Sequence, residues 1–311
     1  MRCAEPDVTY SYTSASNPVT FTVEPGETFE VETVPTCGPQ FDSHTGRHDP
    51  DAEAGINAST GCIAVDGATA GGLLTVHVLE VALHEYGYTR VRDESPVAPG
   101  LALEPTFKAV RIRDGFVEWS DRLRLPARPM VGYIGVARPD EVLSNAHNGR
   151  FGGNFDIPEI GSGARVHLPV FVDGARLHVG DVHAVQGDGE IDGAGGIETG
   201  ARLTLRVEVG DRPDRFRNPR IEHDDWIMTT GFARPAEDAF RQALADLIRW
   251  MVDAFDFDAT AAHMLLAQVL EARGTQFVNP LYTYVCKVRR EYLDAGGRSS
   301  GTRGERSGGR P

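Results

Sequence analysis

Cysteine is scarce in this sequence, and the cysteines that are present stand far apart. The 311 residues contain four cysteines, and no two of them form a C-x-x-C pair. This spacing excludes a disulfide framework and a zinc ribbon, and it favours the reducing cytoplasm. The four residues are Cys3, Cys37, Cys62 and Cys286.

Long apolar runs and an excess of positive charge are also missing. No stretch approaches the ~20 consecutive apolar residues of a spanning helix, and the first residues lack the basic start and apolar run of a signal peptide. The 31 Lys and Arg residues are outnumbered by 45 Asp and Glu residues, so the formal charge is -14. Because this charge repels phosphate groups, we expect neither nucleic acid nor an anionic membrane as a partner.

Several well-known catalytic and nucleotide-binding motifs have no counterpart here. The sequence contains no G-x-S-x-G elbow, no Walker loop and no G-x-G-x-x-G after a predicted strand. A serine hydrolase of that type and a nucleotide-binding protein are therefore not supported.

Short alternating runs, separated by glycine and proline turns, dominate the first two-thirds of the chain. Residues 20–34 alternate on both sides of the Pro25-Gly26 turn, which is typical of a hairpin or of two consecutive strands. The same alternation recurs in residues 73–83, 107–119, 164–172, 175–185 and 201–209. This pattern predicts a mainly β fold, with a β-sandwich-like or jelly-roll-like region over residues 1–205 that carries the site described below.

The apolar period changes to that of an amphipathic helix near residue 235. Apolar residues then recur at steps of three and four, which predicts a helix over residues 235–255. The side chains expected to face the β layer are Leu244, Leu247, Ile248 and Met251. Asp258 is placed to cap a second helix, and Gly274 is placed to stop it.

A closing strand is predicted after these two helices, over residues 282–288. Residues 206–295 therefore form a predicted α+β region. Residues 296–311 are rich in Gly, Ser and Arg, and we expect them to be a disordered basic tail.

The densest polar segment spans residues 180–190. On a strand, Asp181 and His183 are two positions apart and face the same side. Two glycines then allow the backbone to bend, so that three more polar side chains can turn inward. These are Gln186, Asp188 and Glu190. An imidazole with carboxylates suits Zn²⁺ and related divalent ions, although a glycine-rich turn with solvated carboxylates and a core histidine would give the same pattern.

A second polar segment spans residues 148–163. Asn154 and Asp156 share one face if this segment is extended, and they would add an amide and a carboxylate to the first segment. An ordinary Asn/Asp turn is the alternative. His44 and His48 have a spacing that would suit a metal on a helix, but the glycine and proline around them predict a solvated loop.

The two polar segments resemble motifs of the acetamidase/formamidase family. That family's pattern includes G-G-N-x-D, L-P-V and G-D-x-H-A-x-Q-G-D-G-E, which stand here at residues 152–156, 168–170 and 180–190. Similar segments are VEPGE (23–27), NASTGCI (57–63), GATAGG (67–72), PMVGYIGVA (129–137) and QFVNP (276–280). The resemblance covers residues 18–293 and follows the family's order.

This resemblance implies hydrolysis of a small linear amide to a carboxylate and ammonia, with a bound divalent metal that we expect to be Zn²⁺. It implicates Asn154, Asp156, His183, Gln186, Asp188 and Glu190. A metal held by His183, Asp156 and one further acid, Asp188 or Asp181, would activate water and polarise the amide carbonyl. Asp181 could instead orient His183.

The remaining residues would move protons and stabilise charge. Glu190 is the expected general base and proton shuttle, and Gln186 and Asn154 could donate hydrogen bonds to the developing oxyanion. Which acid is a ligand and which is the base stays open at the level of sequence.

The N-terminal half departs from the family pattern. N-P-V-T-G-P-I loses both prolines and the valine, and the G-D that follows becomes Gly71-Gly72. Two alternatives therefore stay open: a catalytically lapsed member that binds a small ligand, and a different β-sandwich metalloenzyme. In each case we expect a cytoplasmic homo-oligomer with a small-molecule ligand.

Overall fold

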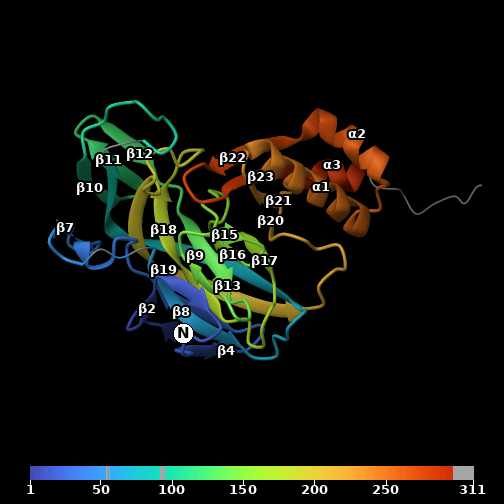
Figure 1. Ribbon diagram of the computed structural model, residues 1–311, viewed down its shortest axis with the longest axis horizontal. Helices are drawn as coiled ribbons and strands as arrows, with labels where there is room; N and C mark the ends of the chain where they lie inside the picture. The colour runs from blue at the N-terminus through green and yellow to red at the C-terminus, as the bar shows by residue number, and fades with distance from the viewer. Residues whose placement is uncertain (54, 56, 92–94, 297–311) are drawn as a thin grey trace, which may run out of the picture.

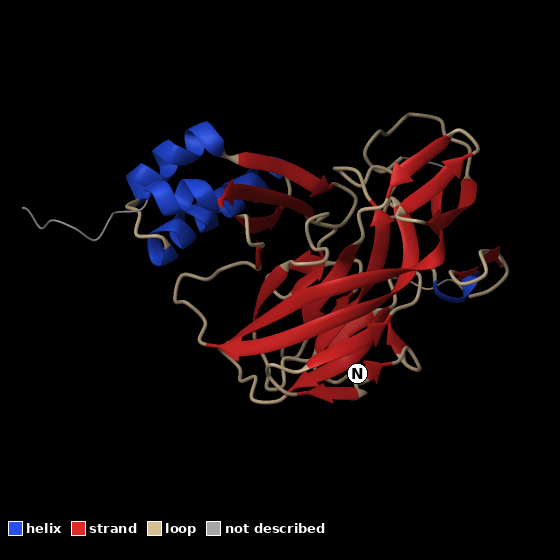
Figure 2. Ribbon diagram, turned by 180° about the vertical axis from the view of Figure 1, so that it is seen from behind, coloured by secondary structure: helices blue, strands red, loops and turns tan. Residues whose placement is uncertain are grey.

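The structure of the chain, a computed structural model, describes residues 1–53, 55, 57–91 and 95–296. Up to residue 233 the chain consists mainly of strands and the loops between them. The three α-helices follow and lie at one end of the molecule (Figure 1). Seen from behind, the strands form one continuous curved body and the helices lie beside it (Figure 2). None of the described helices is long and apolar enough to cross a membrane.

Within the described residues, 19 strands belong to one hydrogen-bonded sheet. Its first strands are β1 (Cys3–Ala4), β2 (Thr9–Tyr10), β4 (Phe21–Val23), β5 (Thr28–Glu32), β8 (Ser59–Val65), β9 (Leu73–Val91), β10 (Thr106–Arg113) and β11 (Phe116–Ser120). The middle strands are β12 (Leu123–Pro126), β13 (Met130–Val136), β15 (Asn148–Gly149), β16 (Gly152–Asn154), β17 (Arg165–Pro169), β18 (Leu177–Val185) and β19 (Ile197–Gly210). The last are β20 (Arg220–Glu222), β21 (Trp226–Ala233), β22 (Glu271–Gln276) and β23 (Tyr282–Arg289).

Two smaller ladders and one short helix complete the described β region. The ladders pair β3 (Tyr12–Ser14) with β14 (Val142–Ser144), and β6 (Phe41–Asp42) with β7 (Arg47–His48). The 3-10 helix η1 spans Gly38–Gln40. The mainly β fold predicted from the alternating runs is confirmed.

The long strands β9 and β19 form the frame that positions the site. They pair antiparallel from Leu73↔Gly210 to Tyr88↔Glu198. Along β19 the odd positions from Ala201 to Val207 are fully buried, whereas Arg202 is exposed. This alternation of period two places one face of the strand in the main core. Strand β19 also pairs with β18. Because β18 pairs with β13 as well, β18 lies in the interior of the sheet.

The C-terminal layer consists of α1 (Ala236–Ala254), α2 (Ala259–Val269) and α3 (Arg290–Gly296) around β20–β23. Helix α1 buries Leu247 and Met251 completely, in one cluster with Ile227 of β21 and Val288 of β23. Leu244 and Ile248 are partly buried in the same cluster. The predicted amphipathic helix is confirmed, because its apolar stripe faces the strands.

The cap of the second helix is also as predicted, but its end is not. Asp258 Oδ1 accepts a hydrogen bond from the Ala261 amide at 2.9 Å. Helix α2 ends at Val269 rather than near Gly274, because Glu271–Gln276 pairs with β23 as strand β22. Pairing with a neighbouring strand outweighs the local helical preference of this segment.

Residues 20–34 form two consecutive strands rather than a hairpin, which is the second of the two structures predicted for them: β4 pairs parallel to β8, and β5 pairs with β19. The short helix α3 follows the closing strand and was not expected. Strand β19 continues across the predicted boundary at residue 205, so the division into two regions stays a prediction. Of the predicted tail, residues 297–311 lie outside the described residues.

The packing of α1 leads to the first prediction. Leu247→Ala should lower the free energy of unfolding by about 2–5 kcal/mol, because it leaves a cavity between the helix and the strands. Met264→Ala, at a side chain of α2 that is 66% exposed, is the control and should change it by less than about 0.5 kcal/mol. Chemical denaturation measures both. An unchanged Leu247→Ala would mean that α1 is peripheral to the fold.

Candidate active site

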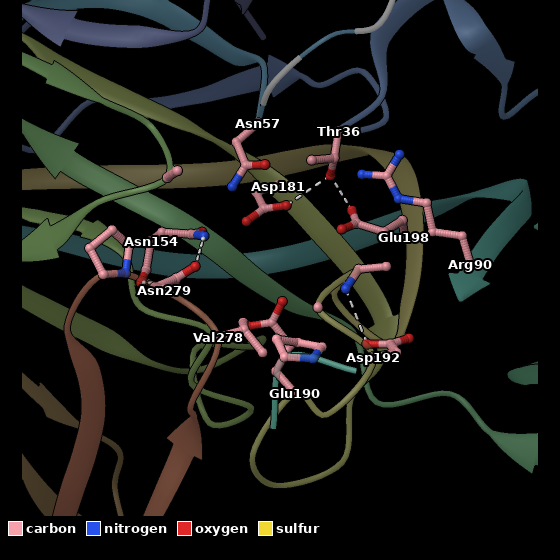
Figure 3. A pocket seen from close by; sticks show the side chains of 15 residues that line it. Thr36, Asn57, Arg90, Asn154, Asp181, Glu190, Asp192, Glu198, Val278 and Asn279 are labelled. Carbon is pink, nitrogen blue, oxygen red and sulfur yellow. Dashed lines mark hydrogen bonds between the residues drawn. The ribbon is translucent and has the colours of Figure 1, made fainter. Parts of the chain in front are cut away.

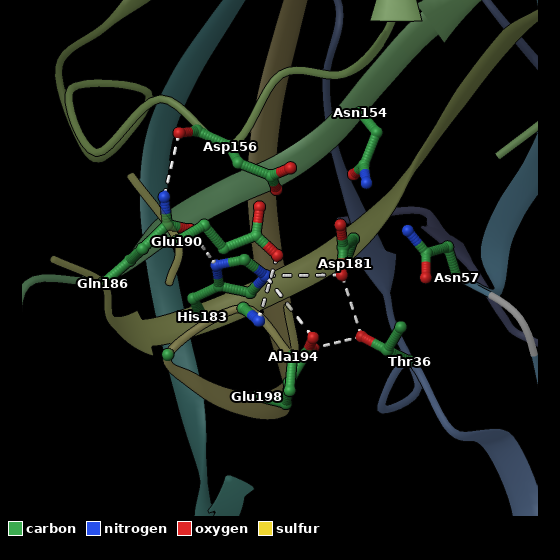
Figure 4. Close-up of polar contacts among 12 residues, drawn as sticks. Thr36, Asn57, Asn154, Asp156, Asp181, His183, Gln186, Glu190, Ala194 and Glu198 are labelled. Carbon is green, nitrogen blue, oxygen red and sulfur yellow. Dashed lines mark hydrogen bonds and ion pairs between the residues drawn. The ribbon is translucent and has the colours of Figure 1, made fainter. Parts of the chain in front are cut away.

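A cluster of buried ionisable side chains lies where β18 and β19 meet the loop between them. Asp181 and His183 come from β18, Glu198 comes from β19, and Glu190 comes from the connecting loop. Asp156 joins them from the turn after β16. Figure 4 shows these side chains converging, with Asp181 and Glu198 both on the Nε2 side of the His183 ring.

The orientation of His183 is fixed by Gln186. Both amide hydrogens of Gln186 donate to backbone carbonyls, to Asp156 O at 3.0 Å and to Thr275 O at 3.2 Å. Its Oε1 must therefore accept from His183 Nδ1, which lies 2.8 Å away. His183 Nε2 consequently faces the carboxylates, 3.3 Å from Asp181 Oδ1 and 3.7 Å from Glu198 Oε1.

The carboxylates around the ring raise the pKa of His183. Burial opposes the charged imidazole, but Glu198, Asp181 and Asp156 outweigh burial and raise this pKa to about 10. Burial also raises the pKa of Asp156 above its ordinary value, and the charge of Asp181 adds to this effect. For Glu198, burial and then Asp181 raise the pKa well above its ordinary value.

Glu190 has a strongly raised pKa as well. Burial is the main cause and the nearby Asp156 carboxylate is the second. One of its oxygens, Oε1, accepts the backbone N–H of Gly195 at 3.1 Å. The other oxygen, Oε2, is buried without a hydrogen-bond partner in the described part of the chain. A carboxyl group in this setting is well suited to hold or release a proton.

Donors from distant segments hold the other carboxylates. Thr36, in the loop after β5, contacts Glu198 Oε2 and lies 2.8 Å from Asp181 Oδ1. Because a hydroxyl carries one hydrogen, it can donate to only one of them at a time. Asn279, in the loop between β22 and β23, donates to Asp156 Oδ2 at 3.1 Å.

Several of these residues have backbone conformations that L-residues adopt rarely. The φ angles of Asp156, Asp181 and Glu190 are 49°, 56° and 49°. Such left-handed conformations of non-glycine residues cost free energy and occur preferentially at functional sites. Here they turn three carboxylates toward one point instead of leaving them alternating along their segments.

The cluster opens into a cavity of about 450 Å³ (Figure 3). Asp181, Glu190 and Glu198 line the cavity, whereas His183 and Asp156 are fully buried and are not part of its lining. The other polar side chains of the lining include three amides and one cation: Asn57, Asn154, Asn279 and Arg90. A small polar molecule that enters this cavity therefore meets both acidic groups and amide donors.

Comparisons with known proteins decide the family. A model of the Acetamidase/Formamidase family matches residues 146–281. The structure of a predicted acetamidase/formamidase from Thermoanaerobacter tengcongensis is 30% identical, with a TM-score of 0.87 over 95% of this chain and 97% of that one. An acetamidase structure from Bacillus halodurans is also 30% identical, with a TM-score of 0.86 over 95% of this chain and 100% of that one. The chain belongs to the acetamidase/formamidase family.

The matches to curated members of the acetamidase/formamidase family cover a smaller share of this chain and of each relative. The acetamidase of Mycolicibacterium smegmatis is 27% identical in an alignment that covers 62% of this chain and 63% of that protein. The chain spans less than two thirds of the length of the curated relatives it matches. The family resemblance inferred from the motifs is thus confirmed, whereas activity and substrate are inferred separately below.

In this family member the structure separates Asp188 from the other predicted ligands. Its side chain is 58% exposed, and its Oδ1 pairs with Arg273 Nε at 2.7 Å. The two neighbouring glycines form a turn that points Asp188 outward instead of inward. Arg273 also pairs with Glu159, so Asp188 belongs to a surface ion-pair network. Asp188 is therefore not among the described residues whose ligand atoms converge in the cluster.

The predicted role of Gln186 also changes. Its two amide hydrogens are used by the carbonyls of Asp156 and Thr275, so none is left for a substrate oxyanion. Gln186 instead positions His183. The Asn154 side chain lines the cavity, and among the described residues its Nδ2 contacts Asn279 Oδ1 at a long 3.4 Å, so its predicted role as a donor stays a prediction.

Sequence reasoning missed Glu198, Thr36 and Asn279. Glu198 and the exposed Arg202 are both at even positions of β19, so strand alternation places Glu198 on the exposed face. At that end of β19, however, both faces are buried, so the alternating pattern does not identify Glu198 as an inward-facing residue. Thr36 stands in a loop without a recognisable pattern. Asn279 lies in QFVNP, a motif already matched to the family, which was the one available signal.

The cluster fits a divalent metal ion. Among the described residues, Asp156, Asp181 and His183 each offer a ligand atom, and these atoms lie within 4.8 Å of one another. Asp156 Oδ1 is buried and accepts no hydrogen bond from any described residue. A Cβ on Gly132 would lie 2.8 Å from Asp156 Oδ1 and 2.9 Å from Asp181 Oδ2, so the missing side chain leaves space beside both carboxylates.

Metal analysis tests this ligand group. His183→Ala should remove one equivalent of bound divalent metal, because it deletes the nitrogen ligand and leaves the acids without it. Asp188→Asn is the matched control from the same loop and should retain all of it, since Asp188 pairs with Arg273 at the surface. Unchanged metal content in His183→Ala, measured on folded protein, would refute the assignment.

Proposed function

We propose that this protein hydrolyses the C–N bond of a small linear amide, giving a carboxylate and ammonia. The observation that carries the proposal is the likeness, over almost the whole fold, to an acetamidase from Bacillus halodurans. The buried acidic cluster supports it, because the cluster opens into a cavity lined by amide side chains. The cavity volume of about 450 Å³ is in the usual range for small-molecule sites.

We assign the metal to His183, Asp156 and Asp181, and nitrogen and carboxylate donors of this kind suit Zn²⁺. When bound, such an ion supplies an acidified water and a Lewis acid for the amide carbonyl. Gln186 keeps the Nδ1–H tautomer of His183, so that Nε2 is available as the ligand atom.

Glu190 is the proposed proton shuttle. The Gly195 N–H holds Oε1, while Oε2 has no hydrogen-bond partner among the described residues. Hydrolysis requires a group that takes a proton from water and returns it to the departing nitrogen. Glu190 lines the cavity and therefore can reach both the attacking and the leaving group.

Asn154 is the proposed donor to the oxyanion. Its Oδ1 is buried without a partner in the described chain, and its Nδ2 makes the long contact to Asn279 described above. A side-chain amide held this loosely can turn its N–H toward a substrate oxygen. Such a donor contributes most when charge develops on the carbonyl oxygen in the transition state.

Compartment and assembly are further parts of this proposal. All four cysteines are free thiols, which supports a reducing compartment such as the cytoplasm. We also expect the chain to form a homo-oligomer. Light scattering on the purified protein measures its mass in solution and tests this prediction. The acidic charge of -14 argues against nucleic acid and anionic membranes as partners.

Ammonia release from a panel of amides tests the activity. The panel should include formamide, acetamide, propionamide and longer linear amides, each assayed with protein loaded with Zn²⁺ and with protein treated with a chelator. We expect ammonia from at least one linear amide, and loss of that activity after chelation. A folded, metal-loaded protein that releases no ammonia from any amide would contradict the proposal.

Substitution of Glu190 tests the mechanism. Glu190→Gln keeps the size of the side chain but removes the base, so ammonia release should fall by about 10²–10⁴-fold. Thermal unfolding and metal content should stay unchanged. Asp188→Asn, two residues away at the surface, is the control and should keep near-normal turnover. Near-normal turnover in Glu190→Gln would move the proton shuttle to another carboxyl group.

A further inference from the structure

A second group of potential ligands lies outside the cavity described above. It consists of Glu32 at the end of β5, His84 on β9, and His44 in the turn between β6 and β7. Each offers one ligand atom, and these atoms lie within 4.8 Å of one another. The three residues line a separate cavity of about 380 Å³.

His84 is held in a defined orientation within this group. Its Nδ1 lies 2.8 Å from Ser43 Oγ, and its Nε2 lies 2.6 Å from Glu32 Oε1. On one side the ring lies against the bare backbone of Gly200, where a Cβ would clash with it. Burial lowers the pKa of His84, so the imidazole is neutral at pH 7, as a metal ligand must be.

Glu32 is oriented as well. Its Oε2 accepts from Arg202 Nε at 2.9 Å, which leaves Oε1 directed at His84. A carboxylate with one oxygen already engaged is a monodentate ligand. The Arg202 side chain is 53% exposed, and after burial and His44 its charge also lowers the pKa of His84, which favours the neutral imidazole.

His44 is the exposed member of the group. Its ring is exposed and lies 4.0 Å from the His84 ring, centroid to centroid, at 31°. Asp42 shapes the turn that presents it: Oδ1 accepts the His44 N–H at 2.9 Å and Oδ2 accepts the Thr45 hydroxyl at 2.6 Å. Asp42 is thereby occupied in the turn, while the exposed His44 imidazole lies beside His84.

We propose that Glu32, His44 and His84 bind a divalent transition metal ion such as Zn²⁺ or Ni²⁺. Two imidazoles and a carboxylate are a known zinc donor set, completed by solvent at a fourth position. Tetrahedral bonds of about 2.0–2.1 Å place ligand atoms about 3.4 Å apart. The Glu32–His84 contact must therefore open slightly, and the exposed His44 ring must move in.

Metal binding at this site requires the other tautomer of His84. The hydrogen between His84 Nε2 and Glu32 Oε1 moves by exchange with solvent to Nδ1, so that the ion takes its place on Nε2 and no net proton is released. His84 then carries its hydrogen on Nδ1, where the Ser43 hydroxyl can accept it. Because a hydroxyl both donates and accepts, Ser43 satisfies His84 before and after binding. The ion would tie the β6–β7 turn to β5 and β9.

Zinc titration of chelator-treated full-length protein tests the site. The His183→Ala background removes the other ligand group, and isothermal titration calorimetry should then show one equivalent of bound Zn²⁺. Adding His44→Asn should weaken that binding by at least about tenfold. His48→Asn is the matched control in the same segment, because His48 stacks on Phe107 at 3.6 Å, and it should leave binding unchanged.

A second measurement does not depend on the His183→Ala background. In the otherwise unchanged protein, Zn²⁺ stoichiometry should fall by one equivalent in His44→Asn and in Glu32→Gln, but not in His48→Asn. Equal stoichiometry and affinity in His44→Asn and His48→Asn would overturn the proposal. Neither readout uses amide hydrolysis, so this outcome is separate from the fate of the proposed activity.

Discussion

The crowding of buried carboxylates around one imidazole is the interaction on which the site depends. Asp156, Asp181, Glu190 and Glu198 are all buried near His183, and isolated charges in such a place would be very costly. They are tolerable because each has donors, and because the imidazole or a bound cation compensates their charge. Burial and the neighbouring carboxylates raise the pKa values of Asp156, Glu190 and Glu198, and the carboxylates raise the pKa of His183.

The sheet provides the rigidity that this crowding requires. Donors from distant parts of the chain contact three of the carboxylates: Thr36, after β5, contacts Asp181 and Glu198, and Asn279, between β22 and β23, donates to Asp156. Gly132 and Gly195 complete the frame, since a Cβ on either would press on the ligand atoms. The site therefore exists only when β18, β19 and the loops around them are assembled, which explains why so much of the chain resembles the family.

Local patterns predicted the elements well where one face of an element is buried. The alternation of β19 and the helical period of α1 were both sufficient, because core burial imposes those periods on the sequence. The same reasoning extended α2 too far, since strand β22 owes its conformation to pairing with β23 rather than to its own residues. The alternation also could not decide between a hairpin and two separate strands for β4 and β5, because the partner of each strand comes from a distant part of the sequence.

For the site, the motifs were enough to predict the family, the ligand types and the closeness of Asp181 to His183, two residues further along. Which acids face inward follows from the folded chain. Asp188 turns out to Arg273, and Glu198, which no pattern marked, lies against His183. The physical reason is that spacing along a strand fixes relative direction only locally, whereas burial of a charge depends on the donors that other segments bring to it.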